Sequence, residues 1–527
     1  MTEPTKPTAE ANSDEAKKRQ REQVEKLLAE APVTSDGSAQ IGGRRMNYTV
    51  SAAFMPVMPP PLADDFGQPQ AAIFTTAYQL NAPPGDRKRS PPPEGVSQPW
   101  GGPAVDSDAL APRPVCFVFN GGPGSSSVWL HLGALGPKRV TINDDGTMPP
   151  PPYQVGDNPD SWFEHLDLVF IDPPHTGYSL SASDDARKKM LSVDGDVDAL
   201  AEAVRAWLAR NKRWNSPVYL AGESYGTTRG AALADKLHEL GVALSGLILV
   251  SCAMDLQSLV FAPRNDLPYA LFLPAFAGVA QYHGKLGGPQ SESPRAARTA
   301  AEAFVAEDYL GALHQGARLE GKARTRIAKR IAELTGLHQA FVEEKNLRLN
   351  DTDFFFELLR DQGRIVGRLE ARVTGPMAAR RTRDWEFDPG LEALLGPYTM
   401  AAQAYLAELG LPTQRRYEVF SMEVNKAWDW NRREGGEPGR GNQYATTSGD
   451  LARALRRNPH LRVLVASGHY DLGTPYAATD WSLAQLDAPA DVLTRVEHHY
   501  YDAGHMMYTR EADLKKLKSD LAHWLSA

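Results

Sequence analysis

Short, uninterrupted apolar runs alternate with amphipathic segments through the first half of the chain. The runs lie at residues 113–120, 165–172, 218–222 and 244–251. Apolar residues recur at helical spacing in the segments 196–211 and 227–241. Continuous apolar runs are typical of parallel strands buried on both faces, and helices between them supply the crossover connections. The pattern therefore predicts a mostly parallel central sheet flanked by helices.

The strand pattern stops after residue 256 and returns near residue 441. Between these points, helical spacing predicts helices at residues 296–315, 324–336, 352–366 and 400–410. The last part of the chain predicts strands at 461–468 and 494–504 and a helix over 510–525. The sequence thus predicts an α/β core in two parts, 36–256 and 441–527, which a helical cap insertion at 257–440 divides.

The N-terminal part carries a weaker pattern. We expect residues 1–35 to form a disordered or loosely helical tail. Its apolar stripe of Val24, Leu27 and Leu28 is typical of a solvated helix, or of a helix that docks on a partner. Two strands and a Pro- and Gly-rich surface loop are predicted next, at 44–54, 71–80 and 82–103.

Composition and charge narrow the function classes. The chain has 527 residues, 42% of them hydrophobic, which is enough for a large core. The net charge of −8 argues against a nucleic-acid-binding protein. No apolar run reaches the roughly 18 residues that predict a membrane span. The sequence has neither the Cys/His spacing of a zinc site nor a glycine-rich phosphate loop followed by Lys, so we expect no cofactor.

The cysteines and the N-terminus bear on the compartment. Cys116 and Cys252 each lie within an apolar run, which predicts buried free thiols rather than a disulfide. The N-terminus is polar from its first residue and lacks the apolar segment of a signal peptide. We therefore expect a cytoplasmic protein by default, or a periplasmic or secreted one if a signal was lost from this end.

One serine stands where a predicted strand gives way to a predicted helix. Ser224 lies in the stretch GESYG at 222–226. A lone G-x-S-x-G match is weak evidence in a chain with 44 glycines. The strand–turn–helix context is what predicts a nucleophile, because a tight turn holds the serine above the sheet edge. The helix N-terminus adds a favourable field for developing negative charge.

A serine nucleophile needs a general base, and the base needs an acid that orients it. In a fold with a serine elbow, the acid and the histidine follow the serine in that order along the chain. We therefore look for both of them after the late predicted strands. Asp471 follows the predicted strand at 461–468, and His505 follows the one at 494–504. Asp502 and His469 are competing candidates beside this pair. A metal site is a further alternative, with the candidate ligands His469, His498, His499 and His505. These histidines lack the spacing of a zinc motif such as H-E-x-x-H.

A glycine-rich loop follows an early strand. Gly121, Gly122 and Gly124 come directly after the predicted strand at 113–120. Acyl transfer needs backbone N–H donors at the oxyanion, and glycines permit that close approach. An early strand–loop junction is where a fold with a serine elbow places its second oxyanion donor.

Five blocks of the sequence, in order, resemble the serine carboxypeptidase family, a branch of the α/β-hydrolases. They are NGGPGSSS at 120–127, FIDPPHTGYSLS at 170–181, GESYGTTR at 222–229, SGHYDLGTP at 467–475 and AGHMM at 503–507. The resemblance covers roughly residues 40–256 and 445–527. Within the family, the chain resembles a bacterial-type member. It implies an α/β-hydrolase fold and a peptide substrate that is shortened from its C-terminus through an acyl-enzyme.

The resemblance also implies a role for each matching residue. These residues are the catalytic Ser224, Asp471 and His505, the oxyanion-hole N–H groups of Gly122 and Tyr225, and Asn120, Gly121 and Glu223 at the terminal carboxylate of the substrate. Glu223 would have to be protonated in order to donate a hydrogen bond to that anion.

The chain departs from the family pattern at three places. Ser125 replaces a cysteine, Val118 replaces a tryptophan, and Ala134 replaces a glutamate that would pair with Glu223. Without that second carboxyl we expect a smaller rise in the pKa of Glu223, so that Glu223 is charged near neutral pH and repels a free C-terminus. An esterase or acyltransferase on the same triad is therefore the alternative function, and Arg229 is a candidate to bind the carboxylate instead. An intact triad argues against a third class, a non-catalytic binding protein.

Overall fold

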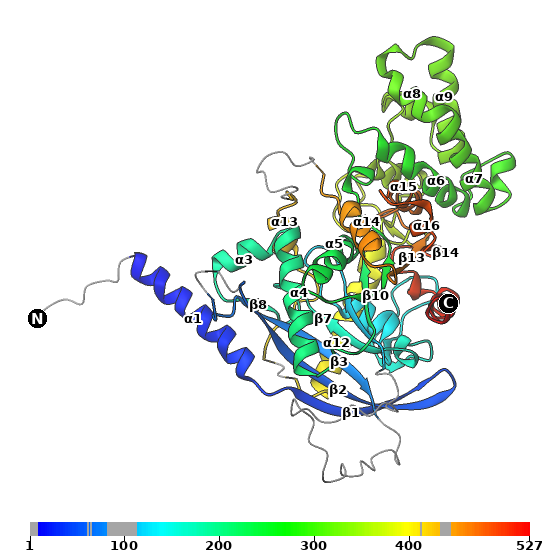
Figure 1. Cartoon of the computed structure of the whole chain (residues 1–527). Helices are drawn as coiled ribbons and strands as arrows, with labels where there is room; N and C mark the ends of the chain where they lie inside the picture. The colour runs from blue at the N-terminus through cyan, green and yellow to red at the C-terminus, as the bar shows by residue number, and fades with distance from the viewer. Residues whose placement is uncertain (1–8, 61–62, 64–65, 82–112, 412–413, 433–443) are drawn as a thin grey trace, which may run out of the picture.

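The computed structural model describes residues 9–60, 63, 66–81, 113–411, 414–432 and 444–527. The predicted loop at 82–103 lies outside these residues. Figure 1 shows that the chain starts with a long helix at one side, runs through a large twisted sheet, makes a helical excursion and returns to the sheet near its C-terminus.

Within the described residues, ten strands form one central sheet. In spatial order they are β1 (Val33–Ile41), β2 (Arg44–Val57), β3 (Ala71–Leu80), β7 (Asp167–Ile171), β4 (Val115–Phe119), β9 (Val218–Glu223), β10 (Leu244–Val250), β13 (Arg462–Gly468) and β14 (Val496–Tyr501), while β8 (Leu180–Ser181) pairs with β3. Neighbouring strands from β7 to β14 are parallel, and β1 to β3 join them antiparallel at one edge. The prediction of a mostly parallel sheet is confirmed. The sequence pattern does not predict β1, a polar strand that pairs with β2 along its whole length.

Both faces of the parallel strands are buried, as their continuous apolar sequence predicts. Successive side chains of a strand point to opposite faces, so β4 sends Cys116 and Val118 into one apolar core and Phe117 and Phe119 into the other. The first core is covered by α1 (Ala9–Ala29), α12 (Pro389–Glu408) and α17 (Glu511–Ser526). The second is covered by α4 (Val193–Arg210), α5 (Tyr225–Glu239) and α14 (Ser448–Arg457).

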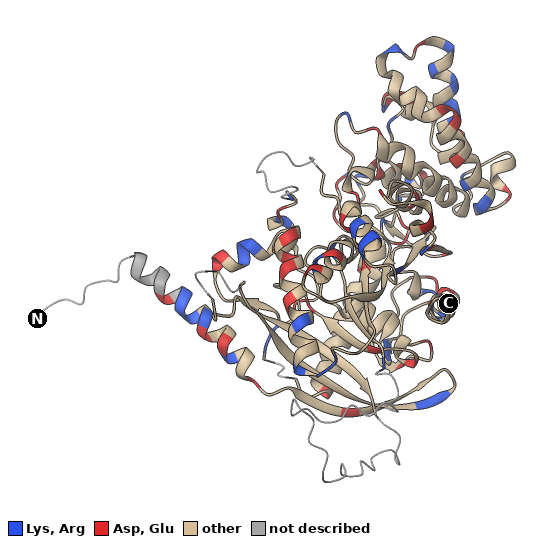
Figure 2. Cartoon of the chain, in the orientation of Figure 1, with Lys and Arg blue, Asp and Glu red and all other residues tan. Residues whose placement is uncertain are grey.

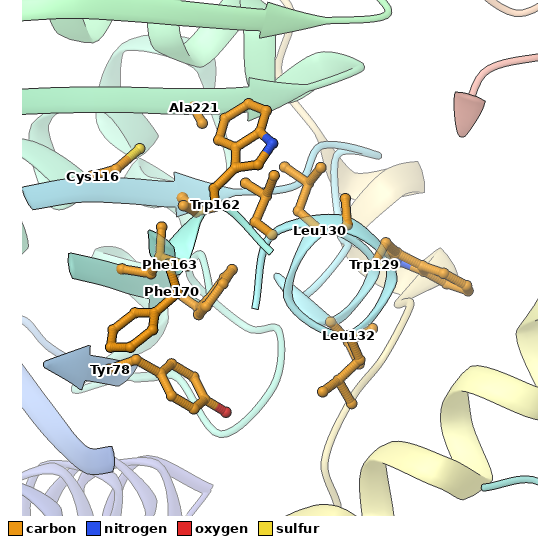
Figure 3. Packing of buried hydrophobic residues seen from close by; sticks show 14 of the residues in the cluster. Tyr78, Cys116, Trp129, Leu130, Leu132, Trp162, Phe163, Phe170 and Ala221 are labelled. Atoms are coloured by element: carbon orange, nitrogen blue, oxygen red, sulfur yellow. The ribbon is translucent and has the colours of Figure 1, made fainter. Parts of the chain in front are cut away.

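Figure 3 shows the first core beside the short helix α2 (Val128–Leu130) and the π-helical turn His131–Leu135 that follows it. Leu130 and Leu132 lie on this turn of chain, and Trp162 and Phe170 belong to the same buried cluster. This packing fixes the segment that follows the glycine-rich loop, and so it fixes the direction in which that loop leaves β4.

The two cysteines are buried and free, which confirms that prediction. Burial raises the pKa of the Cys252 thiol to about 12 and raises that of Cys116 as well, so both remain protonated near neutral pH. Neither thiol therefore has the low pKa of a reactive cysteine.

The predicted tail contains an ordered helix. Over Ala9–Ala29 the chain forms α1, and its Val24 and Leu27 are buried in the first core against the sheet. The Gln20 side chain also donates a 3.0 Å hydrogen bond to the Ser181 carbonyl. Figure 2 shows acidic and basic residues mixed along the rest of this helix. The apolar stripe of α1 therefore docks on the sheet of its own chain.

The segment predicted as a helical insertion contains eight helices within its described residues. They are α6 (Leu267–Tyr282), α7 (Pro294–Phe304), α8 (Leu310–Gln315), α9 (Gly321–Thr335), α10 (Gln339–Glu344), α11 (Asp351–Glu357), α12 and α13 (Met422–Ala427). Helices α6 to α11 surround a separate apolar core, which also includes Tyr470, Leu472 and Tyr476, whereas α12 packs in the core of the sheet. Figure 1 places α7, α8 and α9 far from the β1–β3 edge. The boundaries 257 and 440 stay a prediction.

One predicted helix is partly wrong. Helical spacing predicts a helix over 352–366, but α11 ends at Glu357 and the chain then forms β11 (Arg364–Val366). Gly363, with φ +66°, ends the intervening 3₁₀ turn, and β11 pairs with β12 (Thr374–Pro376) as a short hairpin. A left-handed glycine and a strand partner close in sequence thus override the apolar spacing of Ile365 and Val366. Among the described residues, no helix combines the length and apolarity needed to cross a membrane.

Candidate active site

The predicted elbow forms where β9 meets α5. Ser224 lies between them with φ 60° and ψ −130°, a strained conformation for a residue with a side chain. Two sets of hydrogen bonds hold it. The Ser224 N–H donates to the Val250 carbonyl at 2.9 Å, and the Thr227 N–H and hydroxyl donate to the Ser224 carbonyl at 2.8 and 2.7 Å. Ser224 is half-buried while its neighbours are buried, so the turn presents this side chain alone.

The glycines around Ser224 are needed for close packing. A Cβ on Gly222 would lie 2.2 Å from the Gly226 carbonyl oxygen, a distance that no side chain tolerates. The strand and the first turn of the helix can therefore pass each other only without a side chain there. This is the tight strand–turn–helix that a nucleophile elbow requires.

Asp471 and His505 are brought together at the same edge of the sheet. Asp471 Oδ2 lies 2.7 Å from His505 Nδ1, and both side chains are buried. Asp471 Oδ1 accepts the Gly473 and Thr474 N–H groups at 2.7 and 2.9 Å, and the Thr474 hydroxyl donates to Oδ2 at 2.6 Å. The carboxylate is thus fixed from several sides, and it in turn orients the imidazole.

The end of β10 connects this pair to the serine. Val250, the last residue of β10, accepts the Ser224 N–H at 2.9 Å, and the hydroxyl of the next residue, Ser251, donates to the His505 carbonyl at 2.6 Å. Within the described part of the chain, Ser224 Oγ makes no hydrogen bond to His505. Catalytic hydrogen bonds are often loose in the absence of substrate. The sheet, the elbow after β9, the acid after β13 and the histidine after β14 together confirm the α/β-hydrolase fold.

The charges of the pair support each other. Burial alone lowers the pKa of His505, but the charge and hydrogen bond of Asp471 outweigh it and raise that pKa. Burial likewise acts to raise the pKa of Asp471, and the interaction with His505 outweighs it, so that pKa is lowered. The pair therefore favours a charged aspartate beside a histidine that accepts a proton readily, as a general base must.

The competing candidates lie elsewhere. Asp502 is exposed, and its N–H donates to Asp513 at 3.2 Å. His498 bonds Asp480 and Ser467, both at 2.9 Å. In the part of the chain that the structure describes, no three His, Cys, Asp or Glu side chains are grouped to hold a metal ion.

The glycine-rich loop lies against the N-terminus of α5. A Cβ on Gly121 would lie 2.4 Å from the Tyr225 backbone nitrogen, so only glycine permits this approach. Tyr225 is the first residue of α5, so its N–H has no carbonyl acceptor within the helix. The Gly122 N–H likewise donates to no group among the described residues. The Tyr225 and Gly122 N–H groups thus lie on two segments that are in contact, and their role as oxyanion donors stays a prediction.

A buried polar pair lies next to the elbow. The Asn120 amide donates to Glu223 Oε1 at 2.8 Å, and its oxygen accepts the Leu130 N–H at 3.1 Å. Burial raises the pKa of Glu223 to about 7, and the charge of His505 and the hydroxyl of Tyr508 lower it in part. Burial thus brings the pKa of Glu223 close to neutral pH without a second carboxyl at Ala134, and the expectation that this rise is smaller than with such a partner stays a prediction.

Arg229 does not replace the missing glutamate. Its side chain is fully buried on α5. Nε donates to Asp196 Oδ2 at 2.6 Å, and Nη1 donates to the Asn120 carbonyl at 2.5 Å. Its guanidinium therefore anchors the glycine-rich loop to the elbow helix and is not directed at a substrate.

Sequence reasoning missed three side chains at this site. The Thr474 hydroxyl bonds Asp471, and the hydroxyls of Tyr398 and Tyr508 are buried with no hydrogen-bond partner among the described residues. Thr474 lies three residues after Asp471, a spacing typical of a side chain that closes a turn. No local signal marks Tyr398, because it reaches the site from the predicted insertion, whereas Tyr508 lies three residues after His505.

Residues 106–254 match the model of the serine carboxypeptidase family. The match spans β4, the glycine-rich loop and the elbow, and it confirms the resemblance that the sequence blocks indicate. No curated protein matches the chain. Similar solved structures include a proline iminopeptidase from Mycobacterium smegmatis, with 11% identity, a TM-score of 0.32, and coverage of 93% of this chain and 98% of that chain. A carboxylesterase from Bacillus subtilis has 10% identity, a TM-score of 0.33, and coverage of 98% of both chains.

Proposed function

We propose that this chain is a serine-type carboxypeptidase, which removes C-terminal residues from peptides through an acyl-enzyme. The observation that carries the proposal is the 2.7 Å hydrogen bond between Asp471 and His505, at the sheet edge where the strained turn presents Ser224. The family match over residues 106–254 supports the choice of reaction.

The reaction follows from the roles of these groups. Ser224 Oγ attacks the carbonyl carbon of the last peptide bond, and its proton passes to His505 Nε2. The N–H groups of Gly122 and Tyr225 stabilise the oxyanion of the tetrahedral intermediate. The intermediate collapses, the C–N bond breaks, and His505 returns the proton to the leaving amine. Water, activated by His505 in the same way, then hydrolyses the acyl-enzyme and releases the shortened peptide.

Selection of a free C-terminus falls to Asn120, Gly121 and Glu223. With a pKa of about 7, Glu223 is protonated below neutral pH and can then donate a hydrogen bond to the substrate carboxylate. His505 must be neutral in order to act as the base, and the two groups lie close enough to influence each other's pKa. The active form therefore holds one proton on Glu223 and none on His505 Nε2.

An esterase or acyltransferase on the same triad is the second candidate. Ala134 favours it, because the family's second carboxyl is missing and Glu223 becomes charged as the pH rises above about 7. A charged Glu223 repels a substrate carboxylate, whereas an ester or amide carries no charge at that end. The two functions therefore separate by their dependence on a free carboxylate.

A mixed peptide library, read by mass spectrometry, tests the proposal. Incubation with the wild-type protein should shorten peptides from the C-terminal end, and Ser224→Ala should not. The same peptides with C-terminal amides should be cleaved more slowly near pH 6. Shortening from the N-terminus, internal cleavage, or hydrolysis of ester substrates alone would refute the carboxypeptidase.

A further inference from the structure

The hairpin in the predicted insertion contacts both loops that carry the reacting acid and base. We call residues 367–373, which connect β11 to β12, the clamp loop. Four hydrogen bonds join it to those two loops. They are His505 N–H to the Leu369 carbonyl at 2.7 Å, Gly504 N–H to Glu370 Oε2 at 2.9 Å, Leu472 N–H to the Arg368 carbonyl at 2.9 Å, and Ala371 N–H to the Tyr470 carbonyl at 3.0 Å.

Glu370 provides the one side-chain bond of this set. It is 6% exposed and forms an ion pair with Arg372 at 2.7 Å, in which both side chains are almost fully buried. The Arg372 guanidinium donates to both oxygens of this side chain, at 2.9 and 2.7 Å, and so it holds Oε2 in place for the Gly504 N–H. Glu370 thus adds a side-chain contact to the histidine loop, next to the 2.7 Å backbone bond from the His505 N–H to the Leu369 carbonyl.

The clamp loop restrains His505 on its N-terminal side, and the sheet restrains it on the other. Consecutive N–H groups of Gly504 and His505 donate to Glu370 and Leu369, while Ser251 donates to the His505 carbonyl. The fit is close, because a Cβ on Gly504 would lie 2.3 Å from the Leu369 carbonyl oxygen. Any shift of the clamp loop therefore moves the backbone that carries the imidazole.

The acid loop is held by the same segment. Tyr470 and Leu472 flank Asp471, bond the clamp loop through their backbones, and pack in the apolar core of helices α6 to α11. The clamp loop itself is anchored to α12, since Asp388 at the start of that helix accepts the N–H groups of Arg368 and Leu369 at 2.9 and 3.1 Å. The clamp loop is thus one support for the relative position of Asp471 and His505, beside the direct bond from the Tyr470 N–H to the Ala503 carbonyl at 3.0 Å.

We propose that Glu370 is a positioning residue for the reaction, which holds the histidine loop in register with the acid loop through Gly504. The inference rests on the proposed hydrolase function but not on the choice of a peptide substrate. Glu370 touches neither the substrate nor the reacting atoms. It acts on the orientation of the imidazole toward Asp471 and Ser224.

Loss of this contact should affect turnover more than binding. In Glu370→Ala the Gly504 N–H loses its acceptor, and a displacement of about 1 Å in a reacting group costs up to about a hundredfold in rate. We expect kcat to fall about tenfold to a hundredfold and KM to change little. Glu370→Gln keeps an oxygen for Gly504 and should recover part of the loss.

The pH profile separates positioning from a general loss of folded protein. The charged groups that act on His505 are Asp471, Glu223 and Arg368, and Asp471 is the one that raises its pKa most. A looser contact with Asp471 lowers the pKa of His505, so the acid limb of kcat/KM should move to lower pH in Glu370→Ala. A smaller folded fraction would reduce the rate at every pH and leave the limb in place.

The experiment measures kcat, KM and the acid limb for the wild type, Glu370→Ala and Glu370→Gln with a peptide and with a small activated ester. Glu357→Gln is the matched control, because Glu357 pairs with Arg383 at 2.7 Å in the same insertion but contacts neither loop. A fluorophosphonate that labels Ser224 counts the competent sites. If the wild type hydrolyses the ester but not the peptide, the carboxypeptidase function is refuted. The role of Glu370 is then tested with the ester alone. Wild-type kcat and an unmoved acid limb overturn the proposal if they are found in Glu370→Ala or, should that variant not fold, in Glu370→Met, which has a similar length but lacks the oxygen acceptor.

Discussion

Glu223 is the group whose replacement tests the electrostatics of the site most directly. Its side chain is 4% exposed, and Oε2 has no hydrogen-bond partner among the described residues. The Tyr508 hydroxyl lies near enough to lower its pKa, yet that hydroxyl also completes no hydrogen bond there. Burial nevertheless raises the pKa of Glu223 from 4.5 to about 7. Glu223→Gln removes the charge while keeping the shape.

The magnitude follows from this pKa. A raised pKa means that the folded protein holds the proton more tightly than the unfolded chain, so stability falls as the pH rises from 4.5 to about 7. Each pKa unit corresponds to about 1.4 kcal/mol, which makes the charged folded state about 3 kcal/mol less stable at pH 8. Gln keeps an oxygen for Asn120 and can donate to the Tyr508 hydroxyl. Glu223→Gln should therefore raise the free energy of unfolding by up to about 3 kcal/mol at pH 8 and by little at pH 4.5.

Urea unfolding at pH 4.5, 6 and 8 measures this difference. His505 also has a raised pKa, and its contribution is lost as the pH rises, so the comparison between the two proteins carries the conclusion. Glu202→Gln, which removes a surface ion pair with Arg205, should change stability by less than about 1 kcal/mol at each pH. The reasoning is refuted if wild type and Glu223→Gln differ equally at all three pH values, or if the variant is less stable at pH 8.

Further substitutions test the nucleophile, the orienting acid and the glycine-rich loop singly. Ser224→Ala should lower turnover about a million-fold and leave the circular dichroism spectrum unchanged, and activity within about tenfold of wild type would exclude this nucleophile. Asp471→Asn should lower kcat about ten-thousand-fold, while Asp502→Asn at its exposed position should change it little; the reverse order would make Asp502 the orienting acid. Gly121→Ala should lower kcat about a hundred- to a thousand-fold in a folded protein, because its Cβ would push the glycine-rich loop away from Tyr225, and an unchanged kcat would place the oxyanion donors elsewhere.

The parallel strands and the elbow can be predicted from sequence because their signals are local. The run before Ser224 is apolar from Val218 to Gly222, where β9 is buried, and Gly222 is required by a backbone contact with Gly226, a near neighbour in the chain. Asp471 and His505 are predictable for a related reason. Each follows a late strand of a parallel sheet, and the carboxyl ends of parallel strands lie at one edge.

The remaining features depend on contacts between distant segments. The strand β1 is polar and exists because β2 pairs with it, and α1 is ordered because the sheet buries Val24 and Leu27. The hairpin at 364–376 continues the apolar spacing of the preceding helix, so only a left-handed glycine signals the change. The pKa of Glu223 depends on burial among side chains from several segments, and no local pattern reports such burial.

The predicted cap is not an independent lid over the site. A lid that swings as a rigid body keeps its own core and breaks only contacts at its edge. Here the core of helices α6 to α11 includes Tyr470 and Leu472, the two neighbours of Asp471, and the clamp loop bonds the backbone of His505. A swing of the whole segment would therefore break the hydrogen bonds that the clamp loop makes to the acid loop and the histidine loop, including the 2.7 Å bond from the His505 N–H to the Leu369 carbonyl. On the proposed function, we therefore expect substrate to reach Ser224 without displacement of the clamp loop, because that loop supports the backbone of His505.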